Sequence, residues 1–137
     1  MGTPKIVLDT NILISAFGWE GKPRRILNAC IDGQLELVIS SKQLDELHRV
    51  LQYPKFGFAS RQRERVSAVI LQVATVIEIK GTLRIVKEDP SDNIILETAL
   101  EGKAAFLITG DERILKLKEY EGVKILNAHE FLLVGVF

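Results

Sequence analysis

Four acidic residues stand at comparable places along the chain, and together they have the chemistry of a cation site. They are Asp9, Glu46, Asp92 and Asp111. Carboxylates held close together repel one another, and each raises the pKa of the others unless a cation intervenes. Clusters of oxygen ligands suit Mg²⁺ or Mn²⁺ better than zinc. Such ions activate water and stabilise the leaving oxygen of a phosphodiester. The four acids therefore predict metal-dependent phosphoryl chemistry, with Mg²⁺ or Mn²⁺ as the cofactor.

Each acid also has a purely structural explanation. Asp9 is explained as a turn residue after a strand, and Asp92 as a helix cap in a cluster rich in capping residues. Glu46 is explained as a solvated helix residue, and Asp111 as part of a turn after Gly110. All of these explanations would have to hold at once for the chain to have no site, so the site is the better interpretation.

The elements that position these acids follow from the apolar pattern of the chain. Residues 6–8 form a short, β-branched run that ends at Asp9, and residues 104–108 form an almost wholly apolar run that ends just before Asp111. If these two strands are neighbours at the centre of a parallel sheet, a crevice opens at their carboxyl ends. Asp9 and Asp111 would face each other across that crevice. Thr10 or Asn11 is expected to cap the helix that follows Asp9.

Strands alternate with helices along the whole chain. This alternation predicts βαβ units, right-handed crossovers and a three-layer α/β/α sandwich made of a single domain, residues 1–137. Glu46 falls on an apolar-striped helix that Ser40 or Ser41 can cap, and Asp92 falls in the first turn of a helix that Gly102 ends. A polar stretch, residues 60–65, is expected to precede a further helix. The expected strands are residues 6–8, 35–39, 75–79, 104–108 and 123–126.

Composition limits the class of protein. Eighteen basic residues balance eighteen acidic ones, so any nucleic-acid binding must use local patches. The single Cys30 excludes an internal disulfide framework and a cysteine zinc site, and its place on an apolar stripe predicts a core residue. No apolar run reaches membrane-spanning length and the N-terminus lacks the pattern of a signal peptide, so a soluble, cytoplasmic protein is expected.

Four motifs of the chain resemble those of the PIN-domain ribonucleases, many of which are the toxin halves of VapC-like toxin–antitoxin pairs. The motifs are Val-Leu-Asp9-Thr10-Asn11, Ser41-x-x-Leu44-x-Glu46, Asp89-Pro90-x-Asp92-Asn93 and Leu107-Ile108-Thr109-Gly110-Asp111. The resemblance covers nearly the whole chain. It implies a five-stranded parallel sheet of order 3-2-1-4-5. It also implies a metal-dependent endonuclease that cuts single-stranded or structured RNA, with a possible antitoxin as partner.

The resemblance also assigns roles. It places Asp9, Glu46, Asp92 and Asp111 at the family's catalytic, metal-binding acids. Asn11 and Thr109 match polar residues that orient a carboxylate or a metal-bound water. Asp89, three residues before Asp92, is interpreted as an outer or capping residue.

Several other features have more than one interpretation. Trp19, in a glycine-flanked loop, either stacks on a base or pins the loop to the core. The apolar tail, residues 131–137, is expected to pack in a homodimer or against a partner, and it alternatively completes the core. Basic residues that follow the first and fourth strands are expected to flank the crevice and hold phosphates. These substrate-binding candidates are Lys22, Arg24, Arg25 and Arg113.

Two rival functions remain. One is a PIN-like module that binds RNA or protein without cutting, against which the complete set of four acids counts. The other is a phosphatase that uses Asp9 as its nucleophile, and that chemistry would need a second acid at the position of Asn11. The chain contains no P-loop motif, which excludes a P-loop nucleotidase.

Overall fold

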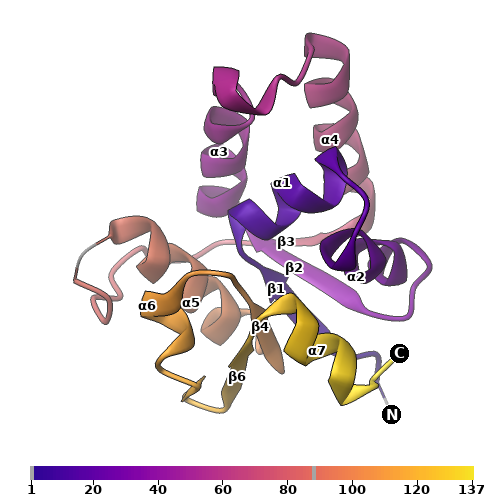
Figure 1. Cartoon of the computed structure of the whole chain (residues 1–137). Helices are drawn as coiled ribbons and strands as arrows, with labels where there is room; N and C mark the ends of the chain where they lie inside the picture. Colours follow the sequence, from indigo (N-terminus) through magenta and orange to yellow (C-terminus); the bar gives the residue numbers. More distant parts are fainter. Residues whose placement is uncertain (1, 88) are drawn as a thin grey trace.

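A central sheet with helices on both faces organises the chain (Figure 1). The structure is a computed structural model that describes residues 2–87 and 89–137. The strands are β1 (Lys5–Leu8), β2 (Glu36–Ser40), β3 (Thr75–Ile77), β4 (Phe106–Ile108), β5 (Glu119–Tyr120) and β6 (Val123–Leu126). The helices are α1 (Thr10–Gly18), α2 (Lys22–Ile31), α3 (Ser41–Val50), the 3₁₀ turn η1 (Pro54–Phe56), α4 (Ser60–Val73), α5 (Pro90–Glu101), α6 (Glu112–Leu115) and α7 (Ala128–Val134).

The sheet order is β3-β2-β1-β4-β6-β5. The five expected strands correspond to β1, β2, β3, β4 and β6, they pair in parallel, and their order is the predicted one. The predicted α/β class is therefore confirmed. The prediction of five strands missed β5, a two-residue strand that pairs antiparallel with β6 at the edge of the sheet. Two polar residues after a tight turn carry no apolar period, so this strand has no signature in the sequence.

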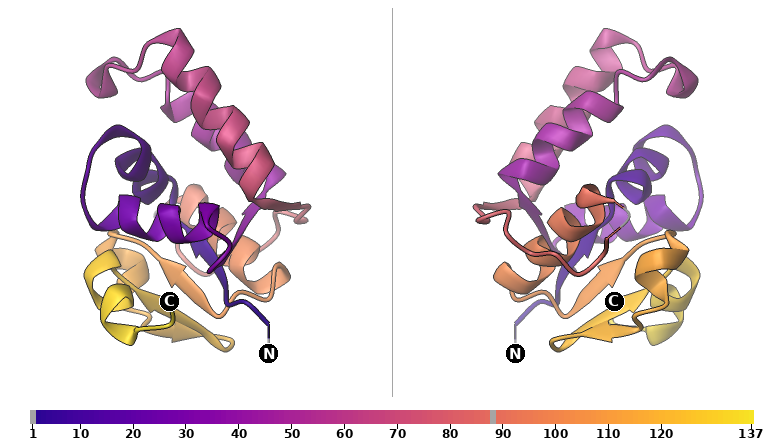
Figure 2. Two further views of the ribbon diagram at one scale, coloured as in Figure 1. Left: turned by 90° about the vertical axis from the view of Figure 1, so that its right-hand side faces the viewer. Right: turned by 90° about the vertical axis from the view of Figure 1, so that its left-hand side faces the viewer.

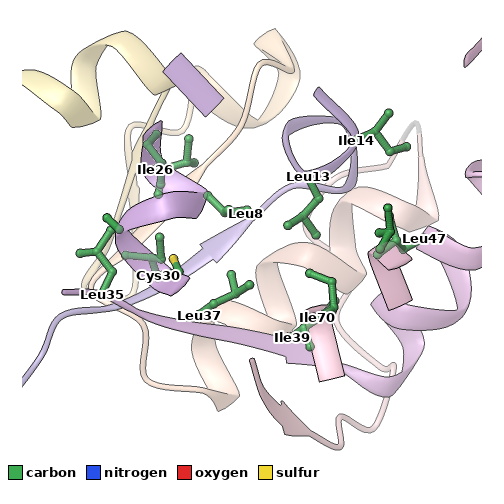
Figure 3. Packing of buried hydrophobic residues seen from close by; sticks show 14 of the residues in the cluster. Leu8, Leu13, Ile14, Ile26, Cys30, Leu35, Leu37, Ile39, Leu47 and Ile70 are labelled. Carbon is green, nitrogen blue, oxygen red and sulfur yellow. The ribbon is translucent and has the colours of Figure 1, made fainter. Parts of the chain in front are cut away.

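Alternating side chains of each central strand enter two separate cores. In β1, Ile6 and Leu8 join a cluster with residues of α1, α2, α3, α4 and α7, whereas Val7 joins a second cluster with α5 and α6. All three side chains are fully buried. Burial on both faces explains why the strand reads as a continuous apolar run. Figure 3 shows Leu8, Leu13 and Leu47 spread through the first cluster and Cys30 beside Ile26 and Leu35. Cys30 is buried, as predicted for a core residue.

Two local expectations were wrong. Asp9, and not Thr10 or Asn11, is the N-cap residue of α1. The polar stretch at residues 60–65 does not precede α4 but forms its first turns. In the views of Figure 2, α3 and α4 extend away from the sheet. The start of α4 therefore lies largely in solvent, which explains its polar residues.

The C-terminal segment divides between the core and the surface. Phe131 is fully buried and its ring packs against those of Phe106 and Phe137. Phe131 therefore completes the core, as the alternative interpretation held, whereas Leu133 and Val134 are exposed. The predicted homodimer remains a prediction. No helix within the described part of the chain is both long and apolar enough to cross a bilayer.

Candidate active site

One cavity collects all four predicted acids. It has a volume of about 250 Å³ and lies at the carboxyl ends of β1 and β4. Asp89 joins the four, so five acidic side chains line this cavity, which we call the acidic cavity. The basic residues of its described wall are Lys55 and Arg113. Strands β1 and β4 are neighbours, and this pairing brings Asp9 and Asp111 together although they are 102 residues apart in the sequence.

Three helices begin at the acidic cavity. Asp9 is the N-cap of α1, Asp111 is the N-cap of α6, and Asp92 lies in the first turn of α5. The backbone N–H groups at a helix start carry partial positive charge, which favours carboxylates there. Asp89 caps α5 by accepting a hydrogen bond from Ser91 N at 2.9 Å, which is one of the roles predicted for it.

Thr109 joins the two strand-end acids. Its hydroxyl donates to Asp9 Oδ2 at 2.6 Å and accepts from the backbone N–H of Asp111 at 3.0 Å. The side chain is fully buried, so its geometry is fixed by packing. Thr109 therefore holds the Asp9 side chain in one orientation relative to Asp111, and its supporting role at a metal site stays a prediction.

A set of buried hydrogen bonds positions Glu46, and the sequence gave no indication of it. Gln43, one turn before it on α3, donates to the backbone oxygen of Leu8 at 2.7 Å, next to Asp9. The Ser40 hydroxyl accepts from Gln43 N and from the Thr98 hydroxyl of α5. These bonds fasten α3 to the end of β1 and to α5, the two elements that carry Asp9 and Asp92. A buried polar group without a partner is costly, so such bonds determine register strongly.

Arg113 lies among the acids. Its Nε and Nη2 donate to the two oxygens of Asp111 at 3.2 and 2.9 Å, a bidentate pair. Its Nη2 also lies 3.4 Å from Asp92 Oδ2 and 3.6 Å from Asp89 Oδ2. The side chain is 40% exposed, so each of these pairs is partly screened by water. Arg113 was predicted to hold substrate phosphates, and its contacts here are with the acids themselves.

The pKa values of the acids diverge. Burial, with the nearby charges of Asp111 and Asp89, raises the pKa of Asp92 to about 7. Burial also raises the pKa of Asp9, against the hydrogen bond from Thr109, and raises that of Glu46. The hydrogen bonds from Arg113 lower the pKa of Asp111. The one acid with a full cationic partner is thus stabilised in its charged form, whereas the other three lack enough positive charge.

Unsatisfied oxygens in the cavity test whether a divalent cation fits. Glu46 Oε2 and Asp92 Oδ2 are buried and make no hydrogen bond, although Asp92 has its longer ion pair with Arg113. No group of three or more acids, histidines or cysteines among the described residues is arranged closely enough to hold an ion. Mg²⁺ keeps several waters and is often held by only one or two carboxylates. The donor set therefore fits a hydrated divalent cation, although it does not form a closed protein cage.

Of the other residues predicted for the site, some line the acidic cavity and some do not. Asn11 lines the acidic cavity, and its backbone N–H group partly offsets the effect of burial on the pKa of Asp9. Arg24 donates to the backbone oxygens of Ala16 and Phe17 and so closes the end of α1. It lines a different cavity, and Lys22 and Arg25 are exposed at the start of α2 without lining the acidic one.

Sequence reasoning missed part of the cavity wall. Tyr53, Lys55 and Phe56 also line this cavity, and they belong to the segment that joins α3 to α4. The Tyr-Pro-Lys-Phe sequence gave only the signal for the end of a helix. A run of aromatic residues in a loop that follows an acid-bearing helix was the one available indication.

The topology and the acid-lined crevice define a class of proteins: α/β folds that bind ligands where the strand order reverses beside the first strand. Within that class the comparison with family models is specific, because the PIN domain model matches residues 5–113. The chain belongs to the PIN domain family. PIN domains are typically nucleases, and the nucleases among them generally use divalent metals.

A solved structure shares the fold. It is the crystal structure of VapBC2 from Rickettsia felis bound to a DNA fragment from their promoter. The match has a TM-score of 0.62 at 18% identity and covers 90% of this chain and 98% of that one. A comparison with curated protein sequences gave no match.

Proposed function

We propose that this PIN-domain protein is a divalent-metal-dependent endoribonuclease that hydrolyses RNA phosphodiester bonds in the cytoplasm. One observation carries the proposal: Asp9, Glu46, Asp92 and Asp111 line one cavity in which two buried carboxylate oxygens lack hydrogen-bond partners. Leaving buried acids without partners costs free energy, so a structure keeps them only where something else neutralises them. A cation and a phosphodiester together meet that requirement.

Asp9, Glu46, Asp92 and Asp111 are the residues that would hold the metal. When bound, a Mg²⁺ or Mn²⁺ ion supplies positive charge that activates water and stabilises the leaving oxygen. Asp92 would lose its proton as positive charge enters, because its pKa of about 7 is set by burial and like charges. Thr109 keeps Asp9 Oδ2 oriented through its donated hydrogen bond. Arg113 holds Asp111 in its charged form.

Cleavage of mixed RNA substrates tests this proposal. We expect cutting in Mg²⁺ or Mn²⁺, none with chelator, and a loss of at least about a hundredfold in Asp9→Asn. Asp45→Asn is the matched control, since Asp45 is an exposed acid on α3, beside Glu46 in sequence. Circular dichroism would verify that Asp9→Asn is folded. Full activity in folded Asp9→Asn, or full activity in chelator, would contradict the proposal.

We further propose that the protein is the toxin of a toxin–antitoxin pair and that it forms a homodimer. The fold shared with VapBC2 supports the first part, and exposed Leu133 and Val134 on α7 support the second. A small adjacent gene whose product co-purifies with this chain and suppresses its toxicity would establish the pair. Light scattering of the purified chain measures the oligomeric state, and a monomer at high concentration would refute the dimer.

Arg113 favours a second candidate, a PIN domain that binds RNA or protein without cutting. Its guanidinium already gives the acids a positive charge within the chain. This candidate predicts RNA binding without cleavage under every metal condition.

A further inference from the structure

Four aromatic side chains form a continuous row beside the acidic cavity. Tyr53 and Phe56 have ring centroids 6.5 Å apart with planes only 7° from parallel, and Phe56 and Phe58 are 6.2 Å apart. Trp19, at the end of α1, extends the row with a centroid 6.1 Å from that of Phe58. We call these four residues the aromatic row. Its members come from two segments of the chain more than 30 residues apart.

The row begins in the wall of the acidic cavity. Tyr53 and Phe56 line that cavity together with Asp9, Glu46 and Asp92, whereas Phe58 lines a neighbouring cavity and Trp19 neither of the two. A molecule whose reacting group lies among the acids can therefore extend directly along the row.

The inner and outer members of the row differ in exposure. Phe56 and Phe58 are half-buried and pack against the first hydrophobic core, which holds their rings in place. The two end rings remain open to solvent: Tyr53 is 39% exposed and Trp19 is 51% exposed. Trp19 contacts Phe58, as expected if it pins the loop, and about half of its surface is free; that it stacks on a base stays a prediction.

Positive charge accompanies the row at the cavity. Lys55 Nζ lies 5.1 Å from the centroid of the Phe56 ring, and Lys55 is itself part of the cavity wall. Exposed aromatic rings next to a cation are the combination that binds single-stranded nucleic acid, because bases stack on the rings and the cation meets the phosphates. Bases within a double helix are already stacked and offer only their edges.

We propose that the aromatic row is a base-stacking platform that receives unpaired nucleotides adjacent to a phosphate held at the acidic cavity. This inference rests on the proposed function and adds a subsite to it. Tyr53 stacks the base nearest the reacting phosphate, Lys55 contacts the phosphate next to that base, and Trp19 stacks a base further along the strand. Selectivity for unpaired RNA then follows from the platform.

Binding and not cleavage is the appropriate measurement. The protein is Asp9→Asn in Mg²⁺ buffer, so that bound RNA is not cut, and the probes are labelled, unstructured oligonucleotides of mixed sequence. Matched probes are a duplex of the same length and an oligomer with the same phosphates but no bases. Trp19 is the chain's only tryptophan, so a base stacked on it quenches the intrinsic fluorescence.

We expect quenching by unstructured RNA and not by the oligomer without bases. We expect Tyr53→Leu to weaken binding about tenfold, which corresponds to about 1.4 kcal/mol for one stacked base. Tyr53→Phe should bind like the parent. The matched control is Phe137→Leu, since Phe137 is also 39% exposed but lies on the C-terminal tail, and it should change nothing.

Three results would overturn the platform. They are equal binding of the oligomer without bases, unchanged binding in Tyr53→Leu, and no binding of any RNA by the parent protein. If Tyr53→Leu instead loses a co-purifying protein partner while RNA binding is unchanged, the row is a protein-docking surface. The proposed nuclease is tested separately, since wild-type cleavage with no base dependence of binding would retain the nuclease and reject only the platform.

Discussion

Two buried carboxylates on one helix have opposite surroundings. Asp92 and Glu97 both lie on α5, five residues apart, and each is 6% exposed. Burial alone would raise the pKa of both groups by disfavouring the charged form. The pKa of Asp92 rises to about 7, whereas the pKa of Glu97 falls below its ordinary value. Similar exposure therefore goes with opposite pKa shifts: burial and like charges dominate at Asp92, whereas backbone hydrogen bonds outweigh burial at Glu97.

Glu97 has its partners within the chain. Its two oxygens accept from the backbone N–H groups of Gly81 and Leu83 at 2.8 and 2.9 Å. These hydrogen bonds outweigh the effect of burial and lower the pKa. Glu97 thus serves as the anchor of the loop after β3, a role that Asn93 repeats one turn earlier by bonding the backbone of Ile85 and Val86.

Asp92 has other acids as its main neighbours, whereas Glu97 has backbone N–H donors. Its neighbours include Asp111, Asp89 and Asp9, and its nearest cation is Arg113 at 3.4 Å. One of its oxygens has no hydrogen bond. A buried acid therefore stabilises the fold when backbone N–H groups surround it, and it is a candidate metal ligand when other acids surround it.

Removing the satisfied acid should have the largest effect on stability. Glu97→Ala leaves two loop N–H groups without acceptors, so we expect the free energy of unfolding to fall by about 2–4 kcal/mol. Urea denaturation measures this change, and limited proteolysis should show earlier cutting within residues 80–87.

The control for this experiment is Glu101→Ala, an exposed acid on the same helix. It should change the free energy by less than about 0.5 kcal/mol. Equal effects of the two substitutions would show that the backbone bonds to Glu97 do not stabilise the loop.

The positions of the acids at strand ends were predictable from sequence. Asp9 and Asp111 each follow an apolar run, and in parallel sheets the carboxyl ends of neighbouring strands share one edge. The central place of β1 and β4 followed from their apolar content, because a strand buried on both faces has no polar positions, whereas the strand order came from the resemblance to PIN domains.

The partners of buried polar groups were not predictable. Glu97 follows the apolar residues Ile95 and Leu96 and looks like an ordinary helical glutamate, since its donors belong to a loop 14 and 16 residues upstream. The partner of Gln43 could not be predicted for the same reason, and neither could the ion pairs of Arg113 with Asp89 and Asp92, although Arg113 itself was singled out as a phosphate contact. Hydrogen bonds between distant segments leave no period in the sequence, whereas burial of an apolar face does.

Replacing Asp92 should show the opposite sign from replacing Glu97. The folded state holds a proton on Asp92 up to a pKa of about 7, whereas the ordinary value is 3.8. Between these values the folded state binds more protons than the unfolded state, so wild-type stability falls as pH rises through this window. Asp92→Asn removes that loss.

We therefore expect metal-free Asp92→Asn to gain stability over wild type as pH rises, by on the order of 2 kcal/mol near pH 8 and little near pH 4. Urea midpoints in chelator at several pH values measure the trend. Asp45→Asn, at an exposed position, should follow the wild-type curve. A pH-independent difference between Asp92→Asn and wild type would mean that Asp92 is charged throughout.

Replacing Arg113 should have the smallest effect, but it is the most specific test of how the surroundings of Asp92 differ from those of Glu97. Its guanidinium is the cation nearest to Asp92, and it also makes a bidentate pair with Asp111. A divalent ion entering the acidic cavity must compete with this positive charge or be repelled by it. Arg113→Gln removes both effects, but the side chain is 40% exposed and the interaction is screened. We therefore expect Mn²⁺ to bind only about threefold more tightly in Arg113→Gln, as measured by the free-Mn²⁺ signal in electron paramagnetic resonance.

Arg84→Gln is the matched control, because Arg84 is bonded to the oxygens of its own loop and lies outside the acidic cavity. It should leave Mn²⁺ affinity unchanged. Weaker Mn²⁺ binding in Arg113→Gln would mean that the arginine holds Asp111 in place for the ion and does not compete with it. In that case the acids around Asp92 depend on a partner within the chain, as Glu97 does, and the contrast between the two carboxylates would be one of degree.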